Sequence, residues 1–432
     1  MAATKEEYTI KVDQLQEGMF IRLDNHWYKH PFLLNSFKIK DKKHIRTIRE
    51  SGINEVVYVP QKSDRAPLPP PAESSASSGQ TASNREKQDT PQKQEEQWDQ
   101  KKTRIEELKR IKGEIDKCAD KYSQNVNKVS NLMNNVFAGQ QEGIENAREV
   151  VDEMVEIFLS DSSTVMHLMD STEVDKDLTY HFLNVSVLSL MIGESAGLEQ
   201  EDMQTLGLGS LFHDLGKMKI EKKHWRKPKH LMNKQEIQLV QQHPKYGVEI
   251  LKKAGIDNDN ILNIVKQHHE AMNGIGYPQG LKEENISRLS KITTLANIYD
   301  NLCNYYDPDK SLPPFFALSL IYKKYTDLVD MNLFSLLVKR LGVYPPGSLV
   351  ELTNGKLGMV MAVNSHSPLD PLIIVHEPEI PKRDAAIIDM SELPDLDIQR
   401  CLSSTELSRE AFRYLSPRTR ISYYMDNTGD KD

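Results

Sequence analysis

The chain has 432 residues, of which 38% are hydrophobic and 27% are charged, and its formal net charge is −8. This length is enough for two or three globular domains, and the acidic balance argues against a DNA-binding protein. Its three cysteines are widely spaced, the first residues lack a signal peptide, and no apolar run of about 18 residues exists, so we expect a cytoplasmic protein with neither disulfides nor a membrane partner.

Residues 1–60 are expected to form a small N-terminal α/β module. The segments TIKVDQL, GMFIRL and VVYV have the composition of strands, and DKKHIRTIRESGI predicts a helix that ends at Gly52. Residues 61–100 are rich in proline, serine and glutamine and nearly lack large apolar side chains. Such a segment cannot build a core, so we predict a disordered linker.

Residues 101–139 are predicted to form a long connecting helix. Apolar side chains recur there every three or four residues, at Ile105, Leu108, Ile111, Ile115, Cys118, Tyr122, Val126 and Val129. A stripe of this kind either packs on its own domain or forms a coiled-coil-like seam that pairs two copies of the chain. The second interpretation predicts a homodimer through residues 101–135.

Residues 140–345 have a helical pattern almost throughout. After Pro345 and Pro346 the chain changes to short β-like runs, SLVELT, LGMVMAV and PLIIVHE, and Asn354-Gly355 is a hairpin turn signal. A helical segment is expected near residues 406–414. The predicted fold is therefore mainly α, with a helical domain at 140–345, the N-terminal α/β module and a C-terminal β-rich extension at 346–432.

The helical region carries histidines in three unusual contexts. His213 and Asp214 are adjacent in the apolar segment LFHDLGK, His243 precedes a proline in QQHPKYG, and His268 and His269 open HHEAMNGIGYP. One isolated histidine is usually structural or exposed, but several imidazoles with a carboxylate are a donor set for Fe, Mn or Zn. Because a carboxylate can bridge two ions, and two ions promote in-line displacement at phosphorus, we predict a metal centre for phosphate chemistry.

The combination of HDLGK, the HP-x-x-G element at His243–Gly247, the double histidine and Gly276-Tyr277-Pro278 resembles the HD-GYP family of metal-dependent phosphodiesterases. HFLNV, from His181 to Val185, also resembles the H-x-x-N-V helix of that family. The resemblance implies an all-helical HD fold that hydrolyses the bacterial second messenger cyclic di-GMP to pGpG, GMP or both, with a metal-bridging hydroxide as nucleophile. The flanking segments resemble those of a subgroup with a small N-terminal domain of unknown function.

The resemblance also implies a set of metal ligands, with Asp214 as the bridge between two divalent ions, for which Fe or Mn is expected. These ligands are His181, His213, Asp214, His243, His268 and His269. Asp177 lies one helical turn before His181, where some members with three metals carry an acid, and a surface acid is the alternative. Lys217 would face the scissile phosphate and stabilise its developing charge, and a solvated lysine is the alternative.

The loop after the double histidine is implied to bind the substrate. Gly274 and Gly276 are expected to permit positive φ angles and a close approach to the ligand. Tyr277, which is followed by Pro278, either contacts the nucleotide or packs the loop. Glu270 either hydrogen-bonds a ligating histidine or is a capping or surface acid.

The sequence departs from the family in two places. Asn297 replaces the first aspartate of an A-D-x-Y-D pattern, so a neutral amide would weaken one ion, and Asp300 is expected to be structural. The basic S-D-R-P-Y element is replaced by YYDPDKSLPP, which leaves Lys291 or Lys310 as substitutes for a phosphate-binding arginine. Two alternatives follow: a catalytically weak or inactive cyclic di-GMP receptor that signals to a protein partner through its N-terminal module, and an HD hydrolase of another nucleotide.

Overall fold

The computed structural model describes residues 7–23, 36–50, 53–69, 113, 122–159, 164–169, 177–305, 310–364, 367–382, 385–393, 396–415 and 422–427. The chain divides into two compact units. The first comprises Met1–Gly113 and Glu377–Ile388, and the second comprises Glu114–His376 and Asp389–Asp432. Most of the predicted linker and of residues 101–121 lies outside the described residues.

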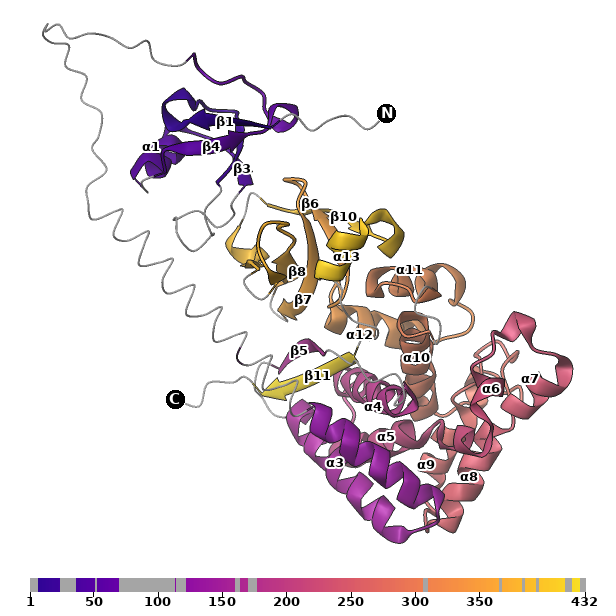
Figure 1. The fold of residues 1–432 in the computed structure, drawn as a ribbon. Coiled ribbons are helices and arrows are strands. Elements are labelled where there is room, and N and C mark those ends of the chain that lie inside the picture. Colours follow the sequence, from indigo (N-terminus) through magenta and orange to yellow (C-terminus); the bar gives the residue numbers. More distant parts are fainter. Residues whose placement is uncertain are drawn as a thin grey trace, which may run out of the picture. The chain divides into compact units, whose positions relative to one another are not determined.

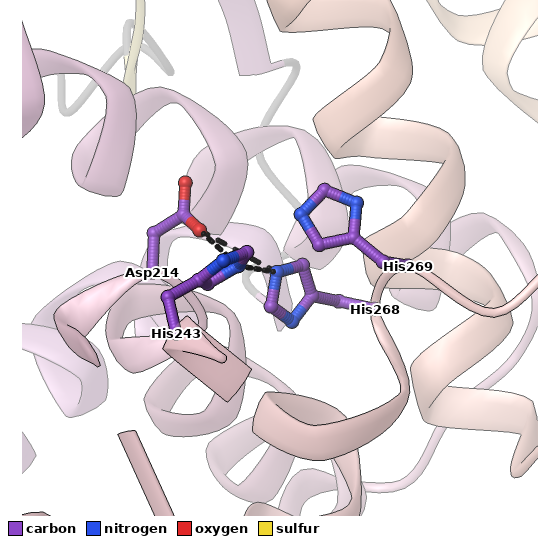
Figure 2. Close-up of side chains that lie close together, drawn as sticks. All are labelled: Asp214, His243, His268 and His269. Atoms are coloured by element: carbon purple, nitrogen blue, oxygen red, sulfur yellow. Dashed lines mark hydrogen bonds and ion pairs between the residues drawn. The ribbon is translucent and has the colours of Figure 1, made fainter. Parts of the chain in front are cut away.

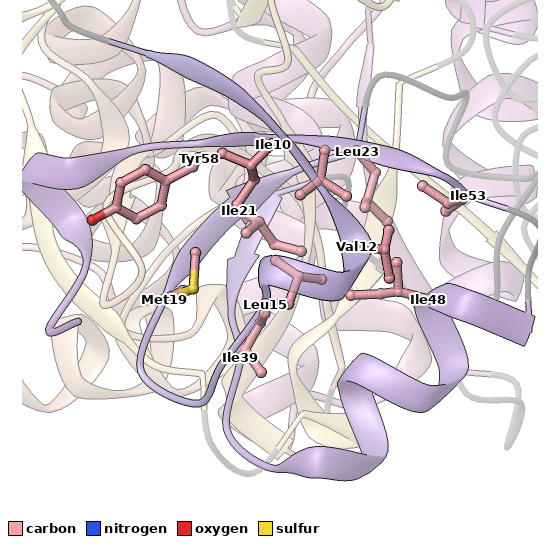
Figure 3. Packing of buried hydrophobic residues seen from close by; sticks show 11 residues of the cluster. Ile10, Val12, Leu15, Met19, Ile21, Leu23, Ile39, Ile48, Ile53 and Tyr58 are labelled. Carbon is pink, nitrogen blue, oxygen red and sulfur yellow. The ribbon is translucent and has the colours of Figure 1, made fainter. Parts of the chain in front are cut away.

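The first unit contains a four-stranded antiparallel sheet in the order β1–β4–β2–β3 and one helix. The elements are β1 (Tyr8–Lys11), β2 (Phe20–Arg22), β3 (Ser36–Lys38), α1 (Lys42–Glu50) and β4 (Glu55–Tyr58). Its core is built from apolar side chains of the strands, of the segments that connect the elements, and of Ile48 on the helix (Figure 3). The predicted α/β module is confirmed, although the first strand ends at Lys11 because Val12–Gln14 forms a 3-10 turn, and β3 was not predicted.

The second unit is mainly helical, as predicted (Figure 1). Its named helices up to the sheet are α3 (Gln141–Leu159), α4 (Asp177–Ser195), α5 (Gln200–Phe212), α6 (Lys222–Trp225), α7 (Lys234–Val240), α8 (His243–Lys253), α9 (Asp259–Gln267), α10 (Arg288–Cys303), α11 (Pro314–Lys324) and α12 (Met331–Leu341). No helix among the described residues is both long and apolar enough to cross a membrane.

Helix α4 is the central helix of this unit. It contacts α3, α5, α10 and α12, and apolar side chains around its whole circumference are buried, among them Phe182, Leu183, Val185 and Leu188. A helix that is apolar on all sides belongs in the interior rather than at the surface. This position places His181, near the beginning of α4, inside the core.

Capping side chains fix the beginnings of two helices that lead to the site. The Asn258 side chain accepts hydrogen bonds from the amides of Asn260 and Ile261 at the start of α9. The Ser287 hydroxyl accepts one from the amide of Ser290 at the start of α10. Such caps satisfy helix amides that otherwise lack partners, so they define where α9 and α10 begin.

Residues 122–137 form the described part of the long helix, and its apolar stripe packs within the second unit. Tyr122, Val126 and Val129 are each at most 2% exposed. The Tyr122 ring stacks on Tyr180 of α4 at 6.1 Å, and its hydroxyl donates to Asn184 Oδ1 at 3.4 Å. Over these residues the stripe packs on its own domain. The homodimer seam through the preceding residues remains a prediction.

The C-terminal part of the second unit is β-rich, which confirms the predicted fold class. Strands β10 (Ile398–Leu402), β6 (Leu349–Leu352), β7 (Leu357–Asn364) and β8 (Ser367–Val375) are neighbours in that order, and they pair antiparallel. The β6–β7 hairpin turns at Asn354-Gly355, where Gly355 has a φ of 76°. Helix α13 (Arg409–Leu415) completes this part of the chain, and strand β9 (Ile387–Asp389) begins in residues assigned to the first unit.

One strand pair was not predicted. Residues of β5 (Thr164–Met169), inside the region expected to be helical, pair antiparallel with β11 (Ser422–Asn427) close to the end of the chain. The two strands are separated by more than 250 residues in sequence, and neither has a partner nearby along the chain. A pairing of this kind leaves no local signal, which explains why the helical prediction was wrong there.

Candidate metal centre

Six side chains that sequence reasoning identified as metal ligands converge in the second unit. One group joins Asp214, His243, His268 and His269, and a second joins His181, His213 and Asp214, with the ligand-type atoms of each group within 4.8 Å of one another. Figure 2 shows the first group, in which His243 and His268 face Asp214. Asp214 is the member that the two groups share.

Helix ends supply most of these residues. His213 follows the last residue of α5, and Asp214 follows it as the residue before the 3-10 turn Leu215–Lys219. His243 is the first residue of α8, and His268 directly follows α9. Because these ends meet beside α4, side chains that are far apart in sequence reach one small buried volume.

The protonation of three histidines is fixed by backbone carbonyls three residues earlier. The Nδ1 atoms of His213, His243 and His268 lie 2.6, 2.6 and 2.8 Å from the carbonyl oxygens of Ser210, Val240 and Val265, respectively. A carbonyl can only accept, so each Nδ1 carries the hydrogen and each neutral ring keeps its lone pair on Nε2. That is the tautomer that binds a metal through Nε2.

These Nε2 atoms are directed at one another. His243 Nε2 lies 3.2 Å from His268 Nε2, and His213 Nε2 lies 3.1 Å from His181 Nε2. Since the Nε2 atoms of His213, His243 and His268 carry lone pairs, their close approach favours a cation between the rings. The arrangement is therefore typical of a ligand set and not of a satisfied core.

Asp214 is completely buried, and both of its oxygens face imidazoles. Oδ1 lies 3.0 Å from His243 Nε2 and 3.4 Å from His268 Nε2, and Oδ2 lies 3.1 Å from His181 Nε2. Oδ2 also forms an ion pair with Lys217. Nevertheless Asp214 Oδ1 and His269 Nε2 are buried without a hydrogen-bond partner among the described residues. Buried polar atoms without partners are costly and rare, so these two atoms fit metal coordination.

The electrostatics keep the ligands in their metal-binding forms. Burial lowers the pKa of His243 and His268 to about 4, and it lowers the pKa of His269 well below the ordinary value. Burial would raise the pKa of Asp214, but the charge of Lys217 and the hydrogen bond from His181 help to hold it well below its ordinary value. At neutral pH these imidazoles are neutral and the carboxylate is ionised, which is the state that divalent metals require.

The orientation of the His181 ring is fixed by Asp300, an acidic residue of α10. Its Nδ1 donates to Asp300 Oδ2 at 2.6 Å, and Asp300 Oδ1 accepts from the amides of Asn184 and Asn304 at 2.9 and 2.8 Å. Burial alone would lower the pKa of His181, but hydrogen bonds to Asp214 and Asp300 raise it. Asp300 therefore positions a ligand, in line with the structural role expected for it.

Asn297 lies on α10 and is buried, but its amide oxygen accepts a hydrogen bond from Asn301 Nδ2 at 2.5 Å. Its role as a weak ligand remains a prediction. Asp177 is the first residue of α4, and its side chain lies outside the described residues.

The loop after the double histidine corrects two expectations. Gly274 has the expected positive φ of 82°, but Gly276 does not: a Cβ there would lie 2.4 Å from the Ala271 amide nitrogen. The close contact that requires a glycine at position 276 is therefore with the backbone of residues 269–271. Glu270 is buried and accepts hydrogen bonds from the amides of Gln279 and Leu281 at 2.7 and 2.8 Å. It caps two amides of the loop, so the capping role is confirmed, and the expectations of a histidine partner and of a surface acid were wrong.

Tyr277 packs the loop against the centre. Its ring stacks on His269 with centroids 4.6 Å apart and an interplanar angle of 18°. Tyr277 also lines a cavity of about 260 Å³ together with His181 and Lys217. The cavity lining therefore includes two residues predicted to face the substrate, Lys217 and Tyr277, and one predicted metal ligand, His181. Neither Lys291 nor Lys310 lines this cavity.

Sequence reasoning gave no physical reason for Gly216 in HDLGK or for Gly247 in HPKYG. A Cβ at Gly216 would lie 1.9 Å from the carbonyl oxygen of His243 and 2.6 Å from the amide nitrogen of Gly247. The two motifs are therefore packed backbone against backbone. The glycine in each motif, Gly216 in HDLGK and Gly247 in HPKYG, was the sequence feature that could have predicted this contact.

Comparisons with known proteins agree with this geometry. Residues 7–147 match a family described as a domain of unknown function, DUF3391, and residues 153–333 match the HD domain. A protein of Pseudomonas aeruginosa named cyclic di-GMP phosphodiesterase PA4108 is 28% identical over 370 residues, which cover 85% of this chain and 84% of that protein.

Two further relatives match the helical region. The cyclic di-GMP phosphodiesterase response regulator RpfG of Xanthomonas campestris is 27% identical over 44% of this chain and 51% of its own length. The 3′3′-cGAMP-specific phosphodiesterase 3 of Vibrio cholerae is 28% identical over 38% of this chain and 35% of its own length. A solved structure, Bd1817, an HDG"Y"P protein from Bdellovibrio bacteriovorus, is 15% identical over 77% of this chain and 98% of that one, with a TM-score of 0.40. The chain therefore carries a match to DUF3391 followed by a match to the HD domain, and its clustered HD pair and GYP loop are similar to those of HD-GYP proteins.

Proposed function

We propose that this chain is a metal-dependent phosphodiesterase that hydrolyses a 3′–5′ phosphodiester of cyclic di-GMP to pGpG, GMP or both. The observation that carries the proposal is the pair of ligand groups that share the buried Asp214. Relatives named cyclic di-GMP phosphodiesterases support the choice of substrate, in particular the one that aligns with 85% of this chain.

The donor set of imidazole nitrogens and a carboxylate fits two divalent ions, for which Fe or Mn is proposed. His181 and His213 would hold one ion, His243, His268 and His269 the other, and Asp214 both. When bound, the ions supply Lewis acidity and activate water near neutral pH, so no serine or cysteine nucleophile is needed.

The protein's own groups hold and orient the substrate. Lys217 lines the cavity next to Asp214, so its ammonium group would face the phosphate and stabilise charge that develops there. Tyr277 closes the cavity beside His269, and Glu270 keeps its loop in position through the two loop amides. Preorganised donors of this kind contribute most to stabilising a charged transition state.

The test is to purify the protein without oxygen, count its metal ions per chain, and follow cyclic di-GMP by chromatography with added Fe(II) or Mn(II). Two ions per chain and the appearance of pGpG or GMP support the proposal. Asp214→Ala should lose both metal and activity, because it removes the shared ligand. An active variant without metal would overturn the proposal.

Two alternatives have specific support. Asn297 removes a charge from the site, which favours a weak or inactive cyclic di-GMP receptor that signals to a partner through the N-terminal unit. Relatives named 3′3′-cGAMP-specific phosphodiesterases favour a second cyclic dinucleotide as substrate. Nucleotide that is bound but intact indicates the receptor, and faster hydrolysis of 3′3′-cGAMP than of cyclic di-GMP indicates the other substrate.

A further inference from the structure

The cavity beside the metal centre has a second, basic and aromatic wall. Its lining includes His181, Lys217 and Tyr277. The same lining includes Trp225, the last residue of α6, and Arg226 and Lys227, which follow it; we call these three residues the α6 wall. No sequence motif had identified this α6 wall, and it lies outside the metal cluster.

The α6 wall is rigidly built. Lys227 Nζ binds both carboxylate oxygens of Glu236 on α7, at 2.9 and 2.8 Å. Glu236 in turn closes a capping box with Asn233 at the start of α7. The Arg226 guanidinium lies over the Trp225 ring at 5.6 Å from its centroid, within cation–π distance. The guanidinium group and the indole ring are thus already side by side in the structure without a ligand.

The chemistry of the substrate class explains what this wall would bind. A cyclic dinucleotide carries two phosphodiester groups and two purine bases, but only one phosphodiester reacts at the metal centre. The second phosphate keeps its charge and needs a cation elsewhere. Guanidinium binds phosphate through two parallel hydrogen bonds, and indole is a strong stacking surface for a purine.

Part of the lining of the same cavity is apolar. Met232, Ile237 and Val240, from the segment before α7 and from α7, contribute to its lining. An indole ring and apolar side chains suit a flat base, while Lys217 and Arg226 supply cationic groups to the same cavity lining.

We propose that Trp225 and Arg226 form a second substrate subsite, which holds the phosphate and one purine of the half of the cyclic dinucleotide that is not being hydrolysed. This inference deepens the proposed function and rests on it for the identity of the ligand. It also addresses the departure at YYDPDKSLPP: the basic group that this segment lacks would be replaced by Arg226, the residue that follows α6.

The test compares full-length, metal-loaded variants. Arg226→Gln removes the charge, Trp225→Ala removes the stacking surface, and Arg226→Lys and Trp225→Phe are the conservative partners. The matched control is Lys223→Gln, which removes a charge from the same short helix at a side chain that is 68% exposed and does not line the cavity. Metal ions per chain and thermal unfolding are measured for every variant.

Affinity for cyclic di-GMP is measured as KM if the wild type turns over, and as Kd if it binds without turnover. We expect Arg226→Gln to weaken affinity by about 10- to 100-fold, as for the loss of a hydrogen bond to a charged group, with kcat within about threefold. Trp225→Ala should weaken the affinity for cyclic di-GMP by about 5- to 100-fold, and Trp225→Phe should keep most of the wild-type affinity. The penalty of Arg226→Gln should be smaller for linear GpG, which has one phosphodiester.

The outcomes separate this inference from the proposed function. Turnover by the wild type, with Arg226→Gln and Trp225→Ala indistinguishable from Lys223→Gln, overturns the subsite and leaves the phosphodiesterase standing. Binding without turnover, with the expected losses of affinity, supports the subsite and overturns hydrolysis. A metal-loaded wild type that binds no cyclic dinucleotide overturns both. If Arg226→Gln does not fold, the Trp225 pair and Arg226→Lys decide by the same criteria.

Discussion

Replacing Gly216 with alanine is the most direct test of how the HDLGK and HPKYG segments hold the metal ligands. The new Cβ would lie 1.9 Å from the carbonyl oxygen of His243 and 2.6 Å from the amide nitrogen of Gly247. Both are backbone atoms, so no change of rotamer can relieve the contact. The two segments must therefore move apart.

The size of the movement follows from the geometry. Real Cβ atoms essentially never approach other heavy atoms closer than 3.0 Å, so a contact of 1.9 Å demands a shift of 3.0 − 1.9 = 1.1 Å. Asp214 and His243, whose carboxylate and imidazole lie 3.0 Å apart, are carried by the two segments that separate. Metal–ligand distances tolerate about 0.2 Å, so we expect loss of at least one ion and a destabilisation of about 1–3 kcal/mol from overpacking.

The assay is metal content per chain together with thermal unfolding. For a domain of this size, the expected destabilisation lowers Tm by about 2–12 °C. Gly113→Ala is the control, because a Cβ there meets no atom within 4 Å, and it should keep the metal content of the wild type. If Gly216→Ala retains both the metal and the Tm of the wild type, the backbone contact between the two motifs does not exist as described.

Three further predictions concern the candidate ligands and the groups that hold them in place. Asp300→Asn should lower metal affinity about 10- to 100-fold in a metal titration, because it weakens the 2.6 Å hydrogen bond that orients His181; an unchanged titration would contradict that role. Glu270→Ala should cost about 1–3 kcal/mol for each of the two loop amides left unpaired, measured by denaturant unfolding, and Glu270→Gln should lie between it and the wild type. Burial lowers the pKa of His243 and His268 to about 4 from 6.5, so the unfolded chain binds protons first as the pH falls. The metal-free protein should therefore lose stability from about pH 6.5 down to 4, and a Tm that does not change over this range would refute the shifts.

The cluster of candidate metal ligands was predictable because it depends on residue types that the sequence shows directly. Adjacent histidine and aspartate in an apolar segment have few roles other than coordination, and the structure brings six of the residues predicted as ligands together. The hydrogen bonds that fix their tautomers were not predictable, because they use backbone carbonyls such as that of Ser210. Any residue at such a position would supply the same oxygen.

Other features depend on distant parts of the chain. The strand Thr164–Met169 exists because residues near the C-terminus pair with it, and Glu270 looks like any exposed acid until the loop folds over it. The stripe at Tyr122, Val126 and Val129 shows the limit of periodicity: the pattern predicts a buried face, but only α4 identifies what covers it.

The charge of the centre connects the departures from the family pattern to the kind of ligand it takes. Among the six clustered residues, Asp214 alone is an acid, and the lowered pKa values leave four of the five imidazoles neutral at pH 7. Two divalent ions would bring four positive charges, of which Asp214 and the nearby Asp300 offset two. Because Asn297 would add no charge, positive charge would remain at the centre for the proposed hydroxide and an anionic substrate to offset. The same lack of charge would weaken the binding of metal and favour a phosphodiester as ligand, under the hydrolase proposal and under the receptor alternative alike.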